Sequence, residues 1–184
     1  MHKVILMIFF SMAVTDTLKK PEFTLVEKYG EIEVREYSEY VIAKTSISQG
    51  DIELNNNMFR TLAGYIFGGN NKSQSIPMTA PVITKNDVSS YDMIFFMLDA
   101  NKPEDLPMPN NTNVSIEMMD LGKTVSITFG MWATDSRVKY YKKKLDKHIK
   151  NNNLQIKSPL MVAQYNSPWT IPPFRKNELI YTIN

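Results

Sequence analysis

Two segments with the periodicity of an amphipathic helix, 51–68 and 135–151, are each flanked by segments in which apolar and polar residues alternate. Alternation with a period of two is typical of half-buried strands, whereas apolar residues three and four apart are typical of helices. The chain therefore has the order strand, strand, helix, strand, strand, and then has that order again. Two halves with the same order predict a pseudo-twofold α+β domain whose sheets curl into a barrel-like core, with both helices packed on it.

The first expected strand pair shows the alternation most clearly. Ile32 and Val34 alternate with charged residues such as Arg35, which predicts one face in the core and the other in water. Pro77 and Pro81 remove two N–H donors, so their segment suits a sheet edge or a bulge. We expect strands at 23–37, interrupted by a turn at 29–31, and at 40–47, 76–84, 91–98, 114–119, 124–131, 160–165 and 178–183.

The first helical segment, 51–68, carries more apolar surface than contact with one sheet requires. Two apolar stripes run side by side along it, and they consist of Leu54, Met58, Leu62 and Tyr65, and of Ile52, Phe59, Ala63 and Ile66. Such a helix is either buried on two sides or has part of its apolar surface lining a pocket. The second helix, 135–151, has one apolar stripe with lysines opposite, and we expect that basic face to be solvated rather than phosphate-binding.

Few side chains of this sequence can hold a metal ion or act as a nucleophile. There is no cysteine, so thiolate ligands, thiolate nucleophiles and disulfides are excluded. The two histidines are His2 and His148, so a Ser-His-Asp arrangement would depend on His148, and no protein-held metal is expected. A formal net charge of +2, with no arginine-rich arm, argues against a nucleic-acid partner.

An apolar run of 11 residues, 4–14, follows Lys3. About 20 apolar residues are needed to span a bilayer, so this run is too short for an ordinary transmembrane helix and fits the core of a signal peptide. Ser11 and Ala13 are small residues suited to a cleavage site before Val14.

The sequence thus predicts a signal peptide at 1–13, a linker at 14–22 and one domain at 23–184. The protein would be secreted or enter the secretory pathway, with no stable membrane span after processing. Glycosylation sequons at Asn71, Asn110 and Asn113 add weak support. The alternative is a cytoplasmic protein in which the apolar run is a buried first strand.

Five short motifs follow one another along the chain. They are Tyr29–Arg35 (YGEIEVR), Phe59–Leu62 (FRTL) running into Tyr65–Asn70 (YIFGGN), Ile76–Val82 (IPMTAPV), Tyr165–Pro168 (YNSP) and Arg175–Glu178 (RKNE). Together they resemble the SOUL/heme-binding protein family, from about residue 24 to residue 183. One such match would be weak, whereas five in order at fitting spacing are specific.

The resemblance implies a distorted antiparallel β-barrel made of duplicated βαββ halves with two flanking α-helices. It also implies a non-catalytic protein that binds heme or another tetrapyrrole reversibly, for buffering or transport, in a hydrophobic cleft beside the first helix. The contact residues expected on that helix are Met58, Phe59, Arg60, Leu62 and Phe67, with Arg60 near the propionates. Some family members have a proposed axial histidine near the first strand pair, but residues 34–37 contain none. We therefore expect binding without strong coordination of the iron by the protein.

Two other functions are compatible with the same resemblance. The family's fold is related to the effector-binding domains of bacterial regulators, and some relatives of that fold are hydrolases. A hydrolase-like enzyme would need a carboxylate or a tyrosine facing the cleft, and Tyr65 and Glu178 are the motif residues of that kind. A protein-interaction module would instead present the apolar residues of the first helix to a partner's groove. For Arg175 and Glu178 we expect a structural ion pair that ties down the last strand.

Overall fold

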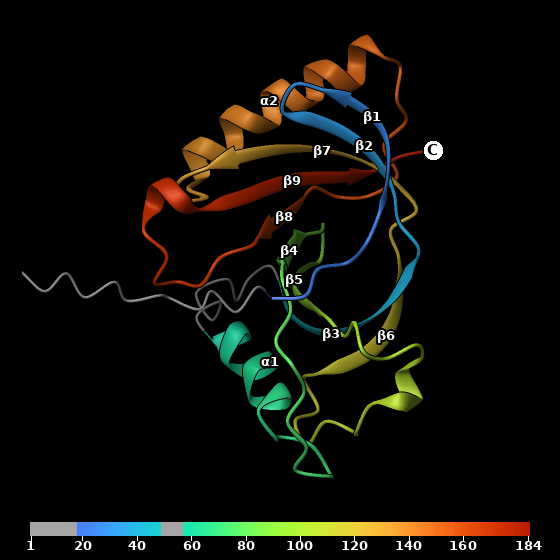
Figure 1. Cartoon of the computed structure of the whole chain (residues 1–184), viewed down its shortest axis with the longest axis vertical. Coiled ribbons are helices and arrows are strands. Elements are labelled where there is room, and N and C mark those ends of the chain that lie inside the picture. Colours follow the sequence, from blue (N-terminus) through green and yellow to red (C-terminus); the bar gives the residue numbers. More distant parts are fainter. Residues whose placement is uncertain (1–17, 49–56) are drawn as a thin grey trace, which may run out of the picture.

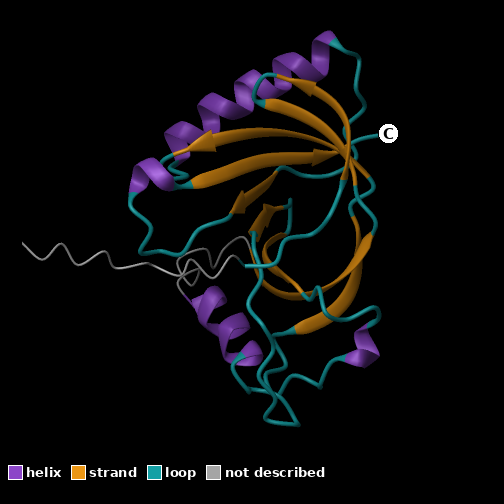
Figure 2. Cartoon of the chain, viewed as in Figure 1, coloured by secondary structure: helices purple, strands orange, loops and turns teal. Residues whose placement is uncertain are grey.

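The computed structural model describes residues 18–48 and 57–184 (Figures 1 and 2). These residues form β1 (Thr24–Tyr29), β2 (Ile32–Glu36), β3 (Glu39–Ser48), α1 (Met58–Ile66), β4 (Val82–Asn86), β5 (Ser90–Phe96), β6 (Ser115–Asp120), β7 (Lys123–Gly130), α2 (Asp135–Asn151), β8 (Met161–Gln164) and β9 (Lys176–Thr182). Short 3-10 turns, η2 (Pro103–Asp105) and η3 (Pro172–Phe174), lie in two of the loops. The expected signal peptide, part of the linker and the start of the expected first helix lie outside the described residues.

All described strands belong to one antiparallel sheet with the order β1-β2-β7-β9-β8-β4-β5-β3-β6. Outward from the contact between β8 and β4, the two sides read β8-β9-β7-β2 and β4-β5-β3-β6. The sheet thus consists of two βαββ units, β3-α1-β4-β5 and β7-α2-β8-β9. The strand that precedes each unit in the sequence pairs with a strand of the other unit. β2 precedes the first unit and pairs with β7 of the second, and β6 precedes the second unit and pairs with β3 of the first.

The sheet curls, with α2 above it and α1 below it in the view of Figure 1. Helix α1 packs on β3 and β5, and α2 packs on β7 and β9. Alternation along the strands divides the core accordingly. Val41 and Ala43 of β3 face α1, whereas Ile42 between them faces the inner side of the curled sheet. The expected α+β distorted barrel with two flanking helices is confirmed.

Two local expectations were wrong. The strand expected at 76–84 begins only at Val82, and the residues before it are not part of a strand of the sheet. Ile76 N–H donates to the carbonyl of Ile66 at 2.8 Å, and the Thr79 hydroxyl donates to the carbonyl of Phe96 at 2.7 Å. The polar face of β2, expected in water, is covered because the sheet curls over it, and Arg35 is only 2% exposed.

Among the helices of the described residues, none is both long and apolar enough to pass through a membrane.

Candidate functional site

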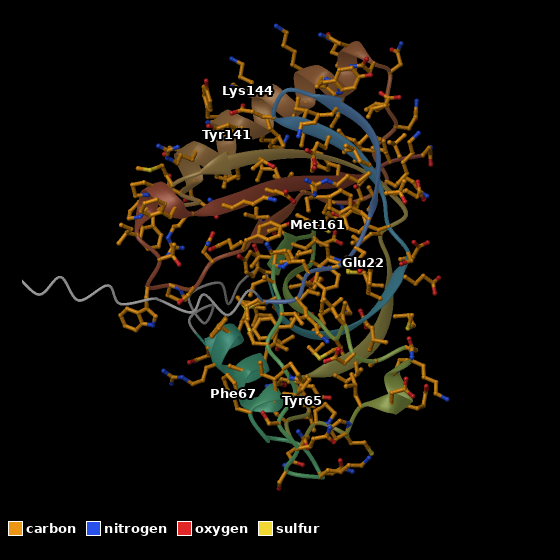
Figure 3. The ribbon with its side chains drawn as sticks, viewed as in Figure 1. Glu22, Tyr65, Phe67, Tyr141, Lys144 and Met161 are labelled. Atoms are coloured by element: carbon orange, nitrogen blue, oxygen red, sulfur yellow. The ribbon has the colours of Figure 1, made fainter. Side chains whose placement is uncertain are left out.

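Helix α1 has one buried face and one exposed apolar side. Met58, Leu62, Tyr65 and Ile66 are buried against the sheet. Phe59 is 42% exposed, and Phe67, directly after the last residue of the helix, is 70% exposed. Figure 3 shows Phe67 at this end of α1. The Phe59 ring still contacts Phe95 of β5, with ring centroids 5.4 Å apart. Two aromatic rings eight residues apart therefore form an apolar wall along the side of α1.

The end of α1 depends on two glycines that follow it. Gly68 has a φ of +103°, a region that favours glycine. Gly69 N–H donates to the carbonyl of Gly64 at 2.8 Å. A Cβ atom at position 69 would lie 2.5 Å from that carbonyl oxygen, so the backbone can approach this closely only without a side chain. This tight turn fixes where Phe67 is presented.

An apolar groove of about 280 Å³ lies beside this wall. Four segments meet around it: the chain ahead of β1, the flank of α1, the stretch that leads into β4, and the end of β8 with the loop that follows. Its lining consists of Leu18, Phe59, Phe67, Met78, Thr79, Ala80, Val82, Gln164, Tyr165, Asn166, Ser167 and Pro168. No charged side chain belongs to this lining, so the groove suits an apolar ligand body.

Tyr165 connects the groove to charged groups. Its hydroxyl donates to Glu178 Oε2 at 2.6 Å. Burial raises the pKa of Tyr165, and the nearby Glu178 carboxylate raises it further, so the phenol stays protonated and acts as a donor. The ammonium groups of Lys176 and Lys20 lie 4.5 Å and 5.8 Å from the centroid of its ring. Two cations thus lie next to a residue that lines the groove.

Glu178 is the centre of a buried polar network on the inner face of the sheet. Arg35 donates to both carboxylate oxygens at 2.9 Å, and Lys176 Nζ lies 2.9 Å from Oε1. Burial alone raises the pKa of Glu178, but the hydrogen bonds and charge of Arg35, together with the Tyr165 hydroxyl, outweigh it and lower the pKa to about 2. The carboxylate is therefore held ionised and fully paired.

The expected ion pair between Arg175 and Glu178 was wrong. Arg175 points away from the network and stacks on Trp132, with its guanidinium carbon 3.5 Å from the ring centroid. Arg175 and Glu178 are three positions apart around the start of a strand. An odd separation places two strand residues on opposite faces. Glu178 pairs instead with Arg35, from the other end of the chain.

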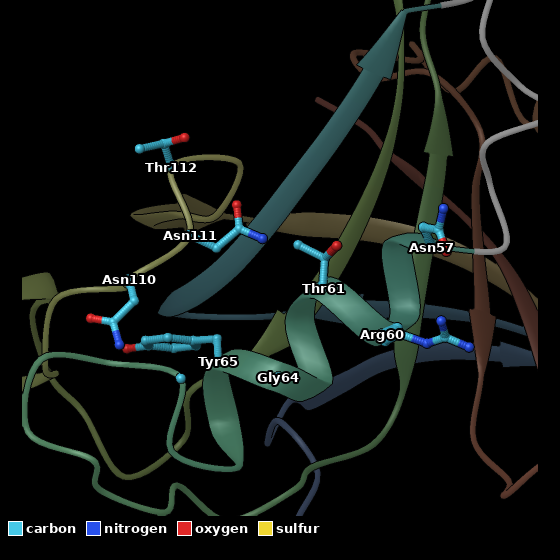
Figure 4. A pocket seen from close by; sticks show the side chains of 9 residues that line it. Asn57, Arg60, Thr61, Gly64, Tyr65, Asn110, Asn111 and Thr112 are labelled. Atoms are coloured by element: carbon cyan, nitrogen blue, oxygen red, sulfur yellow. The ribbon is translucent and has the colours of Figure 1, made fainter.

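A second, polar cavity of about 680 Å³ lies on the other side of α1 (Figure 4). It is lined by Asn57, Arg60, Thr61, Gly64, Tyr65, Gly69, Asn110, Asn111 and Thr112. Amides and hydroxyls dominate this lining, and Arg60 supplies its charge. The Tyr65 hydroxyl donates to the carbonyl of Pro107 at 2.9 Å, so its proton is already bound within the protein.

The residues predicted as ligand contacts separate into three groups. Phe59 and Phe67 line the apolar groove, and Arg60 lines the polar cavity. Met58 and Leu62 lie in the core beneath α1 and line neither space. Sequence reasoning missed the opposite wall, formed by Tyr165 and the residues around it. The YNSP motif that contains Tyr165 was the signal that could have found it.

The described residues hold no group of three or more His, Asp or Glu side chains that could bind a metal ion. His148, the one histidine among them, lies on α2, where its ring is 5.0 Å from that of Tyr29. It therefore takes no part in the groove.

The SOUL heme-binding protein family matches residues 18–182. No curated protein sequence matches the chain. Similar solved structures include a hydrolase from Listeria innocua, with a TM-score of 0.58, 10% identity, and coverage of 84% of this chain and 92% of that one. An uncharacterized conserved protein from Listeria innocua has a TM-score of 0.64, 11% identity and the same coverage. The EcmrR C-terminal domain has a TM-score of 0.61 and 10% identity, over 83% of this chain and 96% of that one.

Identities this low establish a common fold and nothing finer about activity. The family match is of a different kind, because it extends over nearly all of the described residues and includes every segment that lines the groove. The chain belongs to the SOUL heme-binding protein family.

Proposed function

We propose that the protein binds a tetrapyrrole reversibly in the apolar groove beside α1 and does not transform it. The observation that carries this proposal is the pair of aromatic rings, Phe59 and Phe67, exposed on the flank of α1 and facing an apolar wall from the other half of the sheet. Exposed aromatic side chains around a groove are typical of sites for flat apolar ligands.

The residues present fit such a ligand in part. A groove of about 280 Å³ is near the lower limit of small-molecule pockets, roughly 300 to 1,000 Å³. A macrocycle would be held between Phe59 and Phe67 on one side and Tyr165 and Pro168 on the other, with an edge left outside. When bound, heme would supply its iron. Met78 and Tyr165 are the lining residues of a type that ligates heme iron, and the Tyr165 hydroxyl already donates to Glu178.

The anionic side chains of a tetrapyrrole need cationic partners. Lys20 is well placed because its ammonium lies 5.8 Å from the ring of Tyr165, and no ion pair engages it among the described residues. Arg60, the partner expected from the sequence, lies on the helix side that faces the polar cavity. We therefore propose Lys20 as the main propionate partner, with Arg60 contributing less.

An enzymatic role in the same groove has less support. Glu178 is fully buried, and Arg35, Tyr165 and Lys176 hold it as an ion. A carboxylate with a pKa of about 2 is a poor general base or acid near neutral pH. The hydroxyl of Tyr65, the other candidate, donates a hydrogen bond to the backbone carbonyl of Pro107.

The proposal is tested by parallel titration of the full chain with hemin and with metal-free protoporphyrin. Phe59→Ala and Phe67→Ala should each weaken binding of both ligands about tenfold, because each removes a large apolar contact. Lys20→Ala should weaken it by about 1 kcal/mol or less, since that contact is open to water. Tyr140→Ala, which removes an exposed aromatic ring on α2, is the matched control and should change nothing.

The role of the iron is tested with the same assay. Binding that comes mainly from apolar burial predicts nearly equal affinities for hemin and the metal-free ligand. His148→Ala and the volume-conserving Met78→Leu should both leave hemin affinity unchanged. Loss of hemin binding in either variant would show coordination by that residue. If neither porphyrin bound at micromolar concentration, the tetrapyrrole proposal would be rejected.

A further inference from the structure

A second apolar surface lies on the loops next to the groove. We call it the aromatic edge, and it consists of Met131, Trp132, Trp169, Ile171 and Phe174. Trp169 is 91% exposed and Phe174 is 72% exposed, whereas large aromatic side chains are mostly buried in folded proteins. The sequence contains two tryptophans, and both belong to this edge. Large exposed apolar side chains gathered on neighbouring loops are typical of an interaction site.

The aromatic edge is held in place by a buried arginine. The Arg175 guanidinium stacks on Trp132 and donates to the carbonyls of Thr170, Ser167 and Pro168 at 2.9, 3.1 and 2.7 Å. Thr170 N–H closes the turn by donating to the carbonyl of Ser167 at 3.0 Å, which leaves Trp169 at the tip. The exposure of Trp169 is therefore built into the loop.

The aromatic edge is continuous with the groove. Ser167 and Pro168 line the groove, and their carbonyls are two of those bound by Arg175. The turn that contains Ser167 and Pro168 thus borders the groove and is linked to Trp132 through Arg175.

Cations lie beside the aromatic edge. Residues 121–134 and 158–177, which carry the edge, contain no aspartate or glutamate, although Asp135 and Glu178 follow them directly, and Glu178 is paired with Arg35 inside the sheet. Arg175 and Lys176 follow the exposed loop directly, and Lys20 lies next to Tyr165 in the groove. Protruding Trp and Phe side chains with flanking cations are a pattern that binds an anionic lipid interface.

We propose that the aromatic edge docks on a membrane surface that carries anionic headgroups, with Trp169 and Phe174 entering the interface. A lipid surface fits better than a folded partner, because the most exposed ring is at the tip of a turn, a shape suited to insertion. The docking itself does not depend on tetrapyrrole binding, and it is tested without any porphyrin.

The experiment uses the full chain and two sets of vesicles, phosphatidylcholine alone and phosphatidylcholine mixed with phosphatidylserine. The Trp132→Phe variant leaves Trp169 as the single tryptophan reporter. With the mixed vesicles its emission should shift to shorter wavelength and be quenched by lipids with brominated acyl chains. Trp169→Ala and Phe174→Ala should each weaken co-sedimentation of the otherwise unchanged chain about tenfold.

The matched control is Val88→Ala, because Val88 is an apolar residue that is as exposed as Trp169 but lies on the turn between β4 and β5. It should bind vesicles like the unchanged chain. Vesicle binding that leaves Trp169 emission unshifted would assign the contact to another part of the chain and overturn the proposal. Concentration-dependent self-association that Trp169→Ala abolishes, without vesicle binding, would assign the edge to a second copy and overturn it too. A failed porphyrin titration would leave this result intact.

Discussion

Arg35 and Glu178 form a doubly hydrogen-bonded ion pair inside the sheet, although 143 positions separate them in the sequence. Both N–H···O distances are 2.9 Å, the fork geometry that suits a guanidinium and a carboxylate. Since β2 and β9 both flank β7, the pair spans β7 and ties the first strands of the chain to the last one.

This pair predicts how stability depends on pH. The pKa of Glu178 falls from an ordinary 4.5 to about 2 on folding. The stabilisation is therefore present above pH 4.5 and is lost as the pH falls toward 2, and it corresponds to about 3 kcal/mol. Urea unfolding of the unchanged chain between pH 6 and pH 2.5 should show this loss.

The variant Glu178→Gln distinguishes the loss of this ion pair from the other effects of low pH on stability. At neutral pH it should destabilise by about 3–5 kcal/mol, because it removes the buried carboxylate and leaves Arg35 with Glu33, a partly buried side chain, as its acidic partner, and it should flatten the acid dependence. If that variant fails to fold, Tyr165→Phe removes one hydrogen bond to the carboxylate and should cost about 1.5–3 kcal/mol. The control is Glu36→Gln, at an exposed position of β2 next to Arg35. An unchanged acid slope in Glu178→Gln would contradict the assignment.

Leu62 anchors α1 to the sheet. It is fully buried in the cluster under the helix, so Leu62→Ala should lower the free energy of unfolding by about 2–5 kcal/mol. Val26→Ala removes an aliphatic side chain from the exposed face of β1 and should change it by less than about 0.5 kcal/mol. Chemical denaturation of both variants checks this, and equal effects would mean that α1 does not pack as described.

Substitution by alanine should change stability in opposite directions at Gly69 and at Gly64. Gly69→Ala would force a Cβ atom against a backbone oxygen 2.5 Å away and should destabilise by about 1–3 kcal/mol. Gly64→Ala adds a methyl group within α1 where nothing lies within 4 Å, and it should stabilise by about 0.5–1 kcal/mol. Thermal melts of the two variants should therefore move in opposite directions from the unchanged chain.

Processing of the N-terminus stays a prediction from the sequence. Removal of residues 1–13 would leave a chain that begins at Val14. Intact mass and N-terminal sequencing of the protein from its own cell test this, and a mature chain that begins at Met1 would contradict it. The sequons at Asn71 and Asn110 lie in neighbouring loops, since Asn71 N–H donates to the carbonyl of Met108, so any glycans would cluster at one end of the domain.

The element order and the phase of both helices could be predicted because each depends on residues close together in the sequence. Alternation correctly placed Val34 and Arg35 on opposite sides of β2. It could not show that the side carrying Arg35 is covered, because that depends on a curl of the sheet that brings in a strand from the end of the chain.

The site was also predicted only in part: the wall on the first helix was predicted, and the opposite wall was not. Phe59 and Phe67 stood out on one helix, and both line the groove. Met58 and Leu62 could not be separated from them, because a wide apolar arc does not show where the core ends. The far wall at Tyr165 and Pro168 comes from the other half of the chain, and it could be placed only once β8 was paired with β4.

Strands β2 and β6, which each pair with the unit that they do not precede, have a consequence for any attempt to divide the protein. A cut in the loop between β5 and β6 separates the two βαββ units, but it also separates β2 from β7 and β6 from β3. Each fragment would lose a neighbour along an entire strand, and a long unpaired strand edge promotes aggregation. We expect neither fragment to be well behaved alone and the two, expressed together, to reassemble. The two units thus resemble each other in structure, but neither is expected to fold independently of the other.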